Sequence, residues 1–295
     1  MRWAEGFIAV DWGTTNRRGY LIGADGMLQR EMEDDQGILS VQAGGFPAAV
    51  AALRAQLGDK LMLLAGMVGS NRGWIEVPYV PTRAGAADLA SALTHIDDAG
   101  VAIVAGVSHV SGDDADVMRG EEVQIVGAVA AGLVPRDCLI CHPGTHNKWV
   151  VVRDGRIDSF RTVMTGELFN LLKKHSILAD LLAAPVVPVG GFGAGVRHGL
   201  ECDDVTAELF SVRARVLLGQ AERGTASSYV SGLLIGNDIK VGLRLGSDEE
   251  IFVMGRPELT RLYSAALRLA ERESREVDGE QAFLAGARNI VELIK

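Results

Sequence analysis

The sequence predicts an α/β protein with two domains, because one pattern of strands and turns occurs twice along the chain. The first copy, AVDWGTTNRRGYLIGADG, lies near the N-terminus, and the second, ICHPGTHNKWVVVRDG, begins at Ile140. In both copies an apolar run typical of a strand is followed by a Gly-Thr-x-Asn turn, a second strand and an Asp-Gly turn. The 295 residues suffice for two domains of about 100–150 residues each. We therefore expect one domain over 1–134 and another over 135–295.

The first half predicts three strands, a helix, two further strands and then a long helix. Apolar runs indicate strands at 7–10, 19–22, 27–32, 60–65 and 101–107. The segment 47–57 has the Ala and Leu content and the spacing of a helix. The run EEVQIVGAVAAGL after Gly120 also has helical spacing, and it stops before Pro135, which cannot continue a helix. We expect this last helix to join the two domains.

The second half repeats this order of elements. It predicts strands at 139–141, 149–152, 156–162 and 250–254, and helices at 166–175, 206–220, 227–236 and 258–273. The Gly-rich segment PVGGFGAGV matches no nucleotide-binding fingerprint and follows no clear strand, so we expect a mobile connection there. The closing segment 279–294 has helical spacing, and we expect it to pack back on the first domain.

Composition and charge exclude several classes of protein. The net charge of −9 at pH 7 argues against DNA or RNA held by broad phosphate neutralisation. The sequence predicts neither a membrane span of ~20 apolar residues nor a signal peptide. Three cysteines, an odd number, favour the reducing cytoplasm, and we interpret Cys138 and Cys141 as strand packing because no second CxxC completes a zinc site. The sequence does not decide between a monomer and a homodimer.

Both glycine turns have the donors that a phosphate group requires. A glycine turn between two strands exposes backbone N–H groups, and neighbouring hydroxyls add further donors. The first turn, residues 13–16, contains Gly13, Thr14 and Thr15, and the second turn, residues 144–147, contains Gly144, Thr145 and His146. A cation follows each turn, Arg17 in the first copy and Lys148 in the second, and Lys148 faces either the ligand or the solvent. Two such turns indicate a clasp around a polyphosphate.

The two copies differ at the end of their first strand. Asp11 precedes the first turn, whereas His142 occupies that position in the second copy. A carboxylate beside a phosphate turn can hold Mg²⁺ directly or through water, since this ion prefers oxygen ligands. The alternative is a carboxylate that caps the turn. We predict a magnesium site at Asp11 on the N-terminal side only.

Six segments in order resemble one family of sugar-acid kinases. Two β-β-β-α halves joined by a helix resemble the actin/hexokinase/Hsp70 superfamily, which implies two ribonuclease H-like domains with an ATP cleft between them. More narrowly, the chain is similar to the 2-dehydro-3-deoxygalactonokinase family. The segments that carry this resemblance are DWGTTNRRGYL, GMVGSNRGWIEVPYV, MRGEEVQIVGA, HPGTHNKWV, MTGELFNLL and GRPELTRLY.

The resemblance implies transfer of the ATP γ-phosphate to the 6-hydroxyl of 2-dehydro-3-deoxy-D-galactonate, with Mg²⁺, in galactonate catabolism. Three alternatives remain open: a kinase for another sugar or sugar acid, a phosphohydrolase of the exopolyphosphatase type, and a non-catalytic regulator. The GSNRGW segment argues against the hydrolase. The regulator would need an appended binding segment for which 295 residues leave no room.

The resemblance also assigns roles to individual residues. In relatives, an acidic residue after a glycine opens the joining helix and takes the proton of the acceptor hydroxyl, which makes Glu121 or Glu122 the base; helix capping is the alternative. The sugar-acid carboxylate calls for placed cations and donors, for which the candidates are Arg18, Ser70, Asn71, Arg72, Trp74 and Arg119. The adenosine is expected near Gly232, Gly236 and Gly255.

Overall fold

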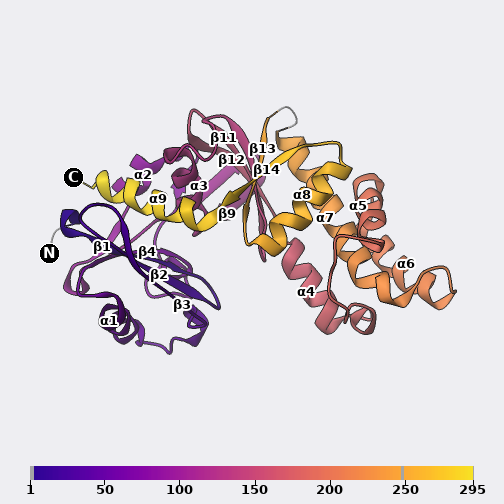
Figure 1. Ribbon diagram of the computed structural model, residues 1–295, viewed down its shortest axis with the longest axis horizontal. Helices are drawn as coiled ribbons and strands as arrows, with labels where there is room; N and C mark the ends of the chain where they lie inside the picture. The colour runs from indigo at the N-terminus through magenta and orange to yellow at the C-terminus, as the bar shows by residue number, and fades with distance from the viewer. Residues whose placement is uncertain (1–2, 247–248, 295) are drawn as a thin grey trace. The chain divides into compact units, whose positions relative to one another are not determined.

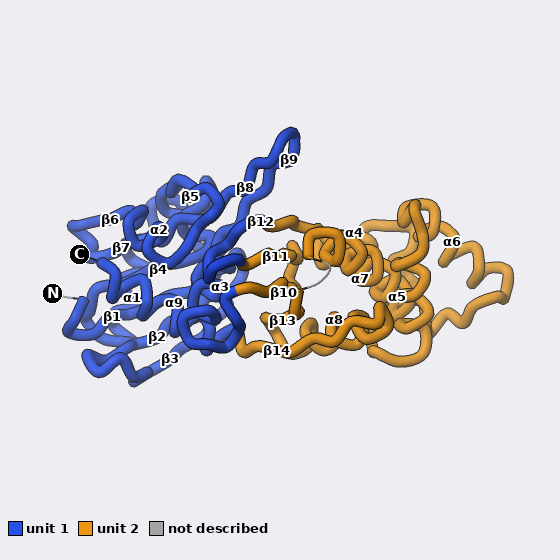
Figure 2. Tube along the Cα trace, turned by 90° about the horizontal axis from the view of Figure 1, so that it is seen from above, with its two compact units in different colours: residues 1–136, 153–159, 279–295 blue, residues 137–152, 160–278 orange. Residues whose placement is uncertain are grey.

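The computed structural model describes residues 3–246 and 249–294, which form two compact units (Figure 1 and Figure 2). Unit 1 holds the described residues up to Arg136, the short segment Arg153–Ser159 and the C-terminal segment from Gly279. Unit 2 holds Asp137–Val152 and Phe160–Asp278. The chain therefore first leaves unit 1 at Arg136, and its final helix belongs to unit 1.

A six-stranded sheet forms the centre of unit 1. Its strand order is β3-β2-β1-β4-β7-β6. The strands are β1 (Phe7–Trp12), β2 (Arg17–Ile22), β3 (Leu28–Asp34), β4 (Leu61–Gly66), β6 (Thr94–Ile96) and β7 (Val101–Ile103). β1 pairs antiparallel with β2 and parallel with β4, and β4 pairs parallel with β7. The carboxyl ends of β1 and β4 therefore lie at the same edge of the sheet, where α/β proteins commonly bind ligands.

Side chains alternate along β1 and so lie on opposite faces of this sheet. Val10 and Trp12 pack on one face with α1 (Phe46–Leu57). Asp11 shares the other face with Ala9. Helix α9 (Gly279–Glu292) covers that face, because Tyr20, which is opposite Ala9 in the register, contacts Phe283 with ring centroids 5.7 Å apart.

Helix α3 (Glu121–Ala130) crosses α9 at two glycines. A Cβ at Gly127 would lie 1.9 Å from the carbonyl oxygen of Ala282, and a Cβ at Gly286 would lie 2.0 Å from that of Val123. Only glycine permits the two backbones to approach this closely. The crossing holds the C-terminal helix beside the helix that begins at Glu121.

A small second sheet with the order β5-β8-β9 belongs to unit 1. Its strands are β5 (Val80–Pro81), β8 (Val107–Ser111) and β9 (Asp114–Met118), and α2 (Ala86–Ser91) follows β5. The β8–β9 hairpin extends away from the rest of unit 1 (Figure 2). The single strand expected at 101–107 was wrong in part, because the chain leaves the large sheet after Ile103 and enters the small one at Val107.

The sheet of unit 2 repeats the pairing seen in unit 1. Its order is β12-β11-β10-β13-β14, formed by β10 (Cys138–His142), β11 (Asn147–Arg153), β12 (Arg156–Val163), β13 (Ile251–Gly255) and β14 (Ser274–Asp278). As in unit 1, the first strand pairs antiparallel with the second and parallel with the fourth. The repeated sequence pattern therefore corresponds to a repeated sheet topology.

Five α-helices belong to the described part of unit 2, four between β12 and β13 and one between β13 and β14. They are α4 (Thr165–His175), α5 (Gly191–Glu201), α6 (Val205–Leu217), α7 (Ala226–Leu245) and α8 (Pro257–Leu269). The mobile connection expected at PVGGFGAGV was wrong, because most of this segment starts α5. Its glycines serve helix packing: a Cβ at Gly195 or Gly199 would lie 2.1 Å from a carbonyl oxygen of α7. A Cβ at Gly232 or Gly236 would likewise lie 2.2 or 2.3 Å from a carbonyl oxygen of α5.

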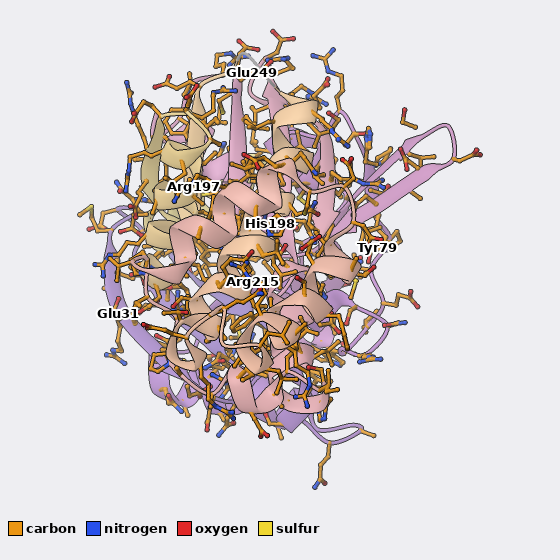
Figure 3. The ribbon with its side chains drawn as sticks, turned by 90° about the vertical axis from the view of Figure 1, so that its right-hand side faces the viewer. Glu31, Tyr79, Arg197, His198, Arg215 and Glu249 are labelled. Atoms are coloured by element: carbon orange, nitrogen blue, oxygen red, sulfur yellow. The ribbon has the colours of Figure 1, made fainter. Side chains whose placement is uncertain are left out.

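Polar contacts join α6 to α5 and α7. The hydroxyl of Tyr229 on α7 lies 2.5 Å from Nδ1 of His198 and accepts a hydrogen bond of 3.3 Å from Arg215. His198 and Arg215 come from α5 and α6 (Figure 3). Nε2 of His198 also lies 3.3 Å from the carboxylate of Glu208. These contacts fix α6 against its two neighbours.

The cysteines take no part in disulfides. Cys138 and Cys141 are buried in β10, in the packing role expected from the sequence, and Cys202 is also a free thiol. No helix in the described ranges is long and apolar enough to cross a membrane.

Candidate active site

Asp11 lies where β1, β4 and α3 meet in unit 1. Gly66 ends β4 with a φ of 92°, and Gly120 precedes α3 with a φ of 110°, both in the region that favours glycine. A Cβ at Gly66 would lie 2.8 Å from the carbonyl oxygen of Trp12 and 3.5 Å from the Asp11 carboxylate. A Cβ at Gly120 would lie 3.2 Å from the Cα of Gly66. The two glycines therefore let the start of α3 approach the partly exposed Asp11.

The first turn is held from its carbonyl side. The carbonyl oxygens of Gly13, Thr14 and Thr15 accept hydrogen bonds of 3.0–3.2 Å from the backbone N–H groups of residues 37–39. Thr14 and Thr15 are exposed, and their own N–H groups donate to no other residue that the structure describes. The turn is thus fixed on one side while two amide donors are left for an anion.

Glu121 and Glu122 begin α3 but differ in burial. Glu122 is completely buried, its Oε2 accepts a hydrogen bond of 2.6 Å from the N–H of Gly120, and its Oε1 has no partner among the described residues. Burial, reinforced by the charge of Glu121, raises the pKa of Glu122 to about 8, so this carboxyl group holds its proton at neutral pH. Glu121 is partly exposed, and its Oε2 accepts a hydrogen bond of 3.1 Å from the N–H of Arg119. Of the two, Glu121 is the one that a substrate can reach.

Two residues of the loop after β4 support the fold. The hydroxyl of Ser70 is largely buried and donates to the carbonyl oxygen of Met67 at 2.7 Å. The ring of Trp74 stacks on Phe46, with centroids 6.1 Å apart and an interplanar angle of 5°. Both side chains therefore shape the loop.

Arg119 joins this loop to the start of α3. Its Nη2 donates to the carbonyl oxygen of Val77 at 2.7 Å, and its guanidinium lies 4.4 Å from the ring centroid of Tyr79. Its Nε and Nη1 are buried and have no hydrogen-bond partner within the described ranges. Such a group gains from an additional acceptor, which an anionic ligand would supply.

The other polar candidates of unit 1 differ in their contacts and in their exposure to solvent. Arg18 is opposite Asp11 in the β1–β2 register, and its Nε lies 3.1 Å from the carboxylate of Glu33 on β3. Asn71 and Arg72 are exposed at the tip of the loop. Arg72 is therefore the cation in this loop that is accessible to a substrate.

Helix α4 begins directly on the second turn. A Cβ at Gly166 would lie 2.3 Å from the carbonyl oxygen of Gly144, so only glycine fits. The N–H of Glu167 donates to the carbonyl oxygen of Thr145 at 2.8 Å. The side chain of Glu167 lies 2.5 Å from Nε2 of His146, which makes an ion pair when the imidazole is protonated. The second turn is thus fixed by the helix that follows its sheet.

The remaining candidates for nucleotide binding are Gly255, Lys148, Gly232 and Gly236. Gly255 ends β13 beside the second turn, and a Cβ added there would lie 3.2 Å from the carbonyl oxygen of Pro143. Lys148 is only 5% exposed, so it is not an exposed strand lysine. Gly232 and Gly236 face α5, as described above, and the close helix packing leaves no space there for a nucleotide. We therefore exclude these two glycines from the candidate site.

A buried carboxylate that sequence reasoning missed lies close behind the second turn. Asp238 of α7 is completely buried and accepts four hydrogen bonds. Its Oδ1 accepts from Asn147 at 2.8 Å and from Trp149 at 2.6 Å, and its Oδ2 accepts from Thr165 and Tyr263 at 2.5 Å each. The one feature of the sequence that could have indicated this carboxylate is Asn147, the last residue of the second turn, because its side-chain amide needs a hydrogen-bond acceptor.

Comparison with solved structures first identifies proteins that share this fold. Component A of (R)-2-hydroxyglutaryl-CoA dehydratase from Acidaminococcus fermentans is 12% identical, with a TM-score of 0.52 over 98% of this chain and 99% of that one. The activator of 2-hydroxyisocaproyl-CoA dehydratase from Clostridium difficile, solved with bound ADPNP, is 13% identical, with a TM-score of 0.51 over 97% and 94%. At these identities the likeness concerns the fold alone. It confirms the expected α/β fold.

The family follows from closer matches. The sequence profile of the 2-keto-3-deoxy-galactonokinase family matches residues 11–290. The 2-dehydro-3-deoxygalactonokinase of Escherichia coli (strain K12) is 34% identical over 292 residues, which are 98% of each chain. A crystal structure assigned to a 2-dehydro-3-deoxygalactonokinase of Sinorhizobium meliloti is also 34% identical, with a TM-score of 0.90 over 98% of this chain and 99% of that one. The chain belongs to the 2-keto-3-deoxy-galactonokinase family.

Proposed function

We propose that the protein transfers the γ-phosphoryl group of ATP to the 6-hydroxyl of 2-dehydro-3-deoxy-D-galactonate. The product is 2-dehydro-3-deoxy-6-phospho-D-galactonate, an intermediate of galactonate catabolism. The observation that carries this proposal is family membership over residues 11–290, supported by the Escherichia coli kinase that matches 98% of the chain. The three cysteines, none of which forms a disulfide, support a cytoplasmic location.

The two glycine turns would hold the phosphates. The first turn offers the N–H groups of Thr14 and Thr15, which make no hydrogen bond to another described residue. The second turn offers Gly144, Thr145 and His146, with Gly255 beside it to admit the adenosine closely. Phosphoryl transfer depends mostly on such positioning and on charge neutralisation.

Asp11 would hold Mg²⁺. Among the residues that the structure describes, no group of three or more His, Cys, Asp or Glu side chains could enclose a metal ion. Mg²⁺ is commonly bound in this sparse way, through one or two carboxylates, several waters and the phosphates of a substrate. When bound, the ion neutralises charge on the β- and γ-phosphates. The partly exposed Asp11 carboxylate supplies a suitable oxygen ligand.

Glu121 would act as the general base. As the 6-hydroxyl oxygen attacks the γ-phosphorus, its proton passes to the Glu121 carboxylate and ADP leaves. Glu121 fits this role because its side chain is partly exposed at the N-terminus of α3, directly after Gly120, which lies against Gly66. The buried, protonated Glu122 does not fit, because it can neither reach a hydroxyl nor accept its proton at neutral pH.

Arginines in the loop after β4 and directly before α3 would hold the carboxylate of the sugar acid. Arg72 is exposed, and the buried Nε and Nη1 of Arg119 have no acceptor among the described residues. Guanidinium groups bind carboxylates with two parallel hydrogen bonds, which fixes orientation as well as position. Asn71 and Arg18 would contribute polar contacts, whereas Ser70 and Trp74 would hold the loop.

A coupled assay of ADP release tests the proposal. ATP-Mg²⁺ is supplied with 2-dehydro-3-deoxygalactonate, with its gluconate-derived epimer, or with neither. We expect rapid ADP release only with a sugar acid, and faster release with the galactonate derivative. Equal release without any acceptor would instead identify a phosphohydrolase, and no release under any condition would exclude both enzymes.

A further inference from the structure

We propose that Asp238 is a positioning residue for ATP binding, because its buried carboxylate holds the second turn from both of its sides. This inference rests on the proposed function, in which the second turn binds the nucleotide phosphates. Asp238 lies on α7, 91 residues beyond Asn147, and nothing in the proposed chemistry requires it to touch a substrate. Its effect would pass through the residues that it binds.

The first connection runs through Asn147, the last residue of the second turn. Its Nδ2 donates to Asp238 at 2.8 Å, and its Oδ1 accepts a weak hydrogen bond from the thiol of Cys141 at 3.6 Å. Asn147 is completely buried, so water does not replace either contact. Trp149, two residues further along β11, donates to the same oxygen of Asp238. The strand that leaves the turn is therefore tied to α7 at two points.

The second connection runs through Thr165, the first residue of α4. Its hydroxyl donates to Oδ2 of Asp238 at 2.5 Å. The next two residues of α4 contact the turn itself: Gly166 lies against Gly144, and the N–H of Glu167 binds the carbonyl oxygen of Thr145. Asp238 thus fixes both the strand after the turn and the helix that packs on the turn. Displacing either would reorient the amide groups that face the phosphates.

The charge of Asp238 matters for this arrangement. Burial raises the pKa of the carboxyl group, while hydrogen bonds from Thr165, Tyr263, Trp149 and Asn147 lower it. The Nδ2 of Asn147 and the Nε1 of Trp149 can only donate, so both need an acceptor in Oδ1. An ionised carboxylate accepts all four hydrogen bonds. An isosteric Asn keeps an acceptor in Oδ1, but its Nδ2 would face the hydroxyls of Thr165 and Tyr263, which would have to turn from donors into acceptors. All four contacts would also lose the added strength of a charged acceptor, so Asn weakens the network.

The first copy of the motif shows that this network is not a requirement of the turn sequence. Asn16 is the counterpart of Asn147, yet it is partly exposed, and its Oδ1 accepts from the neighbouring hydroxyl of Thr15 at 2.8 Å. The first turn is held instead by the backbone N–H groups of residues 37–39. In unit 2 a buried carboxylate is added to the backbone hydrogen bond from Glu167 to Thr145.

The test compares Asp238→Asn with wild type in two measurements. Calorimetric titration gives the Kd for ATP-Mg²⁺ without any acceptor, and steady-state kinetics give separate KM values for ATP and for the sugar acid. We expect Asp238→Asn to weaken ATP binding about tenfold or more, as loss of a supporting partner behind a binding group does. The KM for the sugar acid should stay unchanged. Equal rises in both KM values, or an unchanged Kd for ATP, would overturn the inference.

Further variants keep the test decisive if Asp238→Asn does not fold. Thr165→Val removes the link to α4 and should weaken ATP binding in the same direction by a smaller factor. Ser264→Ala is the matched control, because Ser264 is buried beside Tyr263 and its hydroxyl has no partner in the described ranges. A folded Thr165→Val that binds ATP as wild type does would overturn the inference. Wild type that binds no ATP would refute the proposed function and this inference together, whereas wild type that binds ATP without phosphorylating a sugar acid would refute only the former.

Discussion

The Oε2 of Glu122 accepts a hydrogen bond from the N–H of Gly120, and this contact draws the Glu122 side chain into the interior while Glu121 stays at the surface. Gly120 reaches the φ of 110° that the contact needs because it has no side chain. Two adjacent glutamates therefore have different roles, one as a buried acid and the other as an accessible carboxylate. The sequence alone left both as candidates for the base.

Glu121→Gln should lower kcat by about 10²–10⁴-fold, which is the usual contribution of a general base. Glu122→Gln should keep most of the activity, since an amide replaces a carboxyl group that is already neutral. Steady-state kinetics at saturating ATP-Mg²⁺ and sugar acid measure both effects. Full turnover by Glu121→Gln would remove the proposed base.

The pKa of Glu122 predicts how stability depends on pH. The folded value of about 8 lies above the 4.5 of a free glutamate, so between these values the folded protein holds a proton that the unfolded chain has released. The free energy of unfolding should therefore fall as the pH rises from about 5 to about 8, by on the order of 3 kcal/mol. Glu122→Gln should lack this part of the slope. Urea unfolding at several pH values gives the free energy of unfolding of wild type and of Glu122→Gln. If both fall by the same amount between pH 5 and pH 8, the raised pKa of Glu122 is contradicted.

Asp11→Asn should raise the Mg²⁺ concentration needed for half-maximal activity. The amide is a weaker ligand for this ion than the carboxylate that it replaces, and the expected shift is about 10–100-fold. Asp113→Asn, in the exposed β8–β9 hairpin, is the control for a general loss of negative charge. A Mg²⁺ titration that is the same for all three proteins would show that Asp11 does not bind the ion.

Gly232→Ala should destabilise unit 2. The new Cβ would lie 2.2 Å from the carbonyl oxygen of Phe192, so α5 and α7 must move apart at a cost of about 3 kcal/mol. Gly224→Ala is the control, since no atom lies within 4 Å of its Cβ and the expected change is below ~0.5 kcal/mol. Thermal unfolding measures both variants. If Gly232→Ala kept its stability but bound ATP more weakly, Gly232 would belong to the nucleotide site after all.

The repeated turns were predictable because each is a local feature. Strand, glycine turn and strand follow one another within 20 residues, and the asymmetry between Asp11 and His142 can be read directly from the sequence. The resemblance to a kinase family placed Glu121 at the start of α3. These features depend on short-range pattern, which the sequence displays in full.

Other features depend on distant partners. The glycines of α5 suggest a loop when read alone, and they form a helix because Gly232 and Gly236 on α7 let the two backbones meet. Asp238 has the appearance of an ordinary helical aspartate until four donors from β11, α4 and α8 surround it. Such roles come from tertiary packing, which overrides local propensity.

The most direct test of the proposed function is the ³¹P NMR spectrum of the reaction of ATP-Mg²⁺ with 2-dehydro-3-deoxygalactonate. The proposal predicts that the γ-phosphate signal is replaced by a phosphomonoester signal coupled to the two protons on carbon 6, in equal amount to the ADP formed. Phosphate that appears only as uncoupled orthophosphate, or as an ester at another carbon, would contradict it.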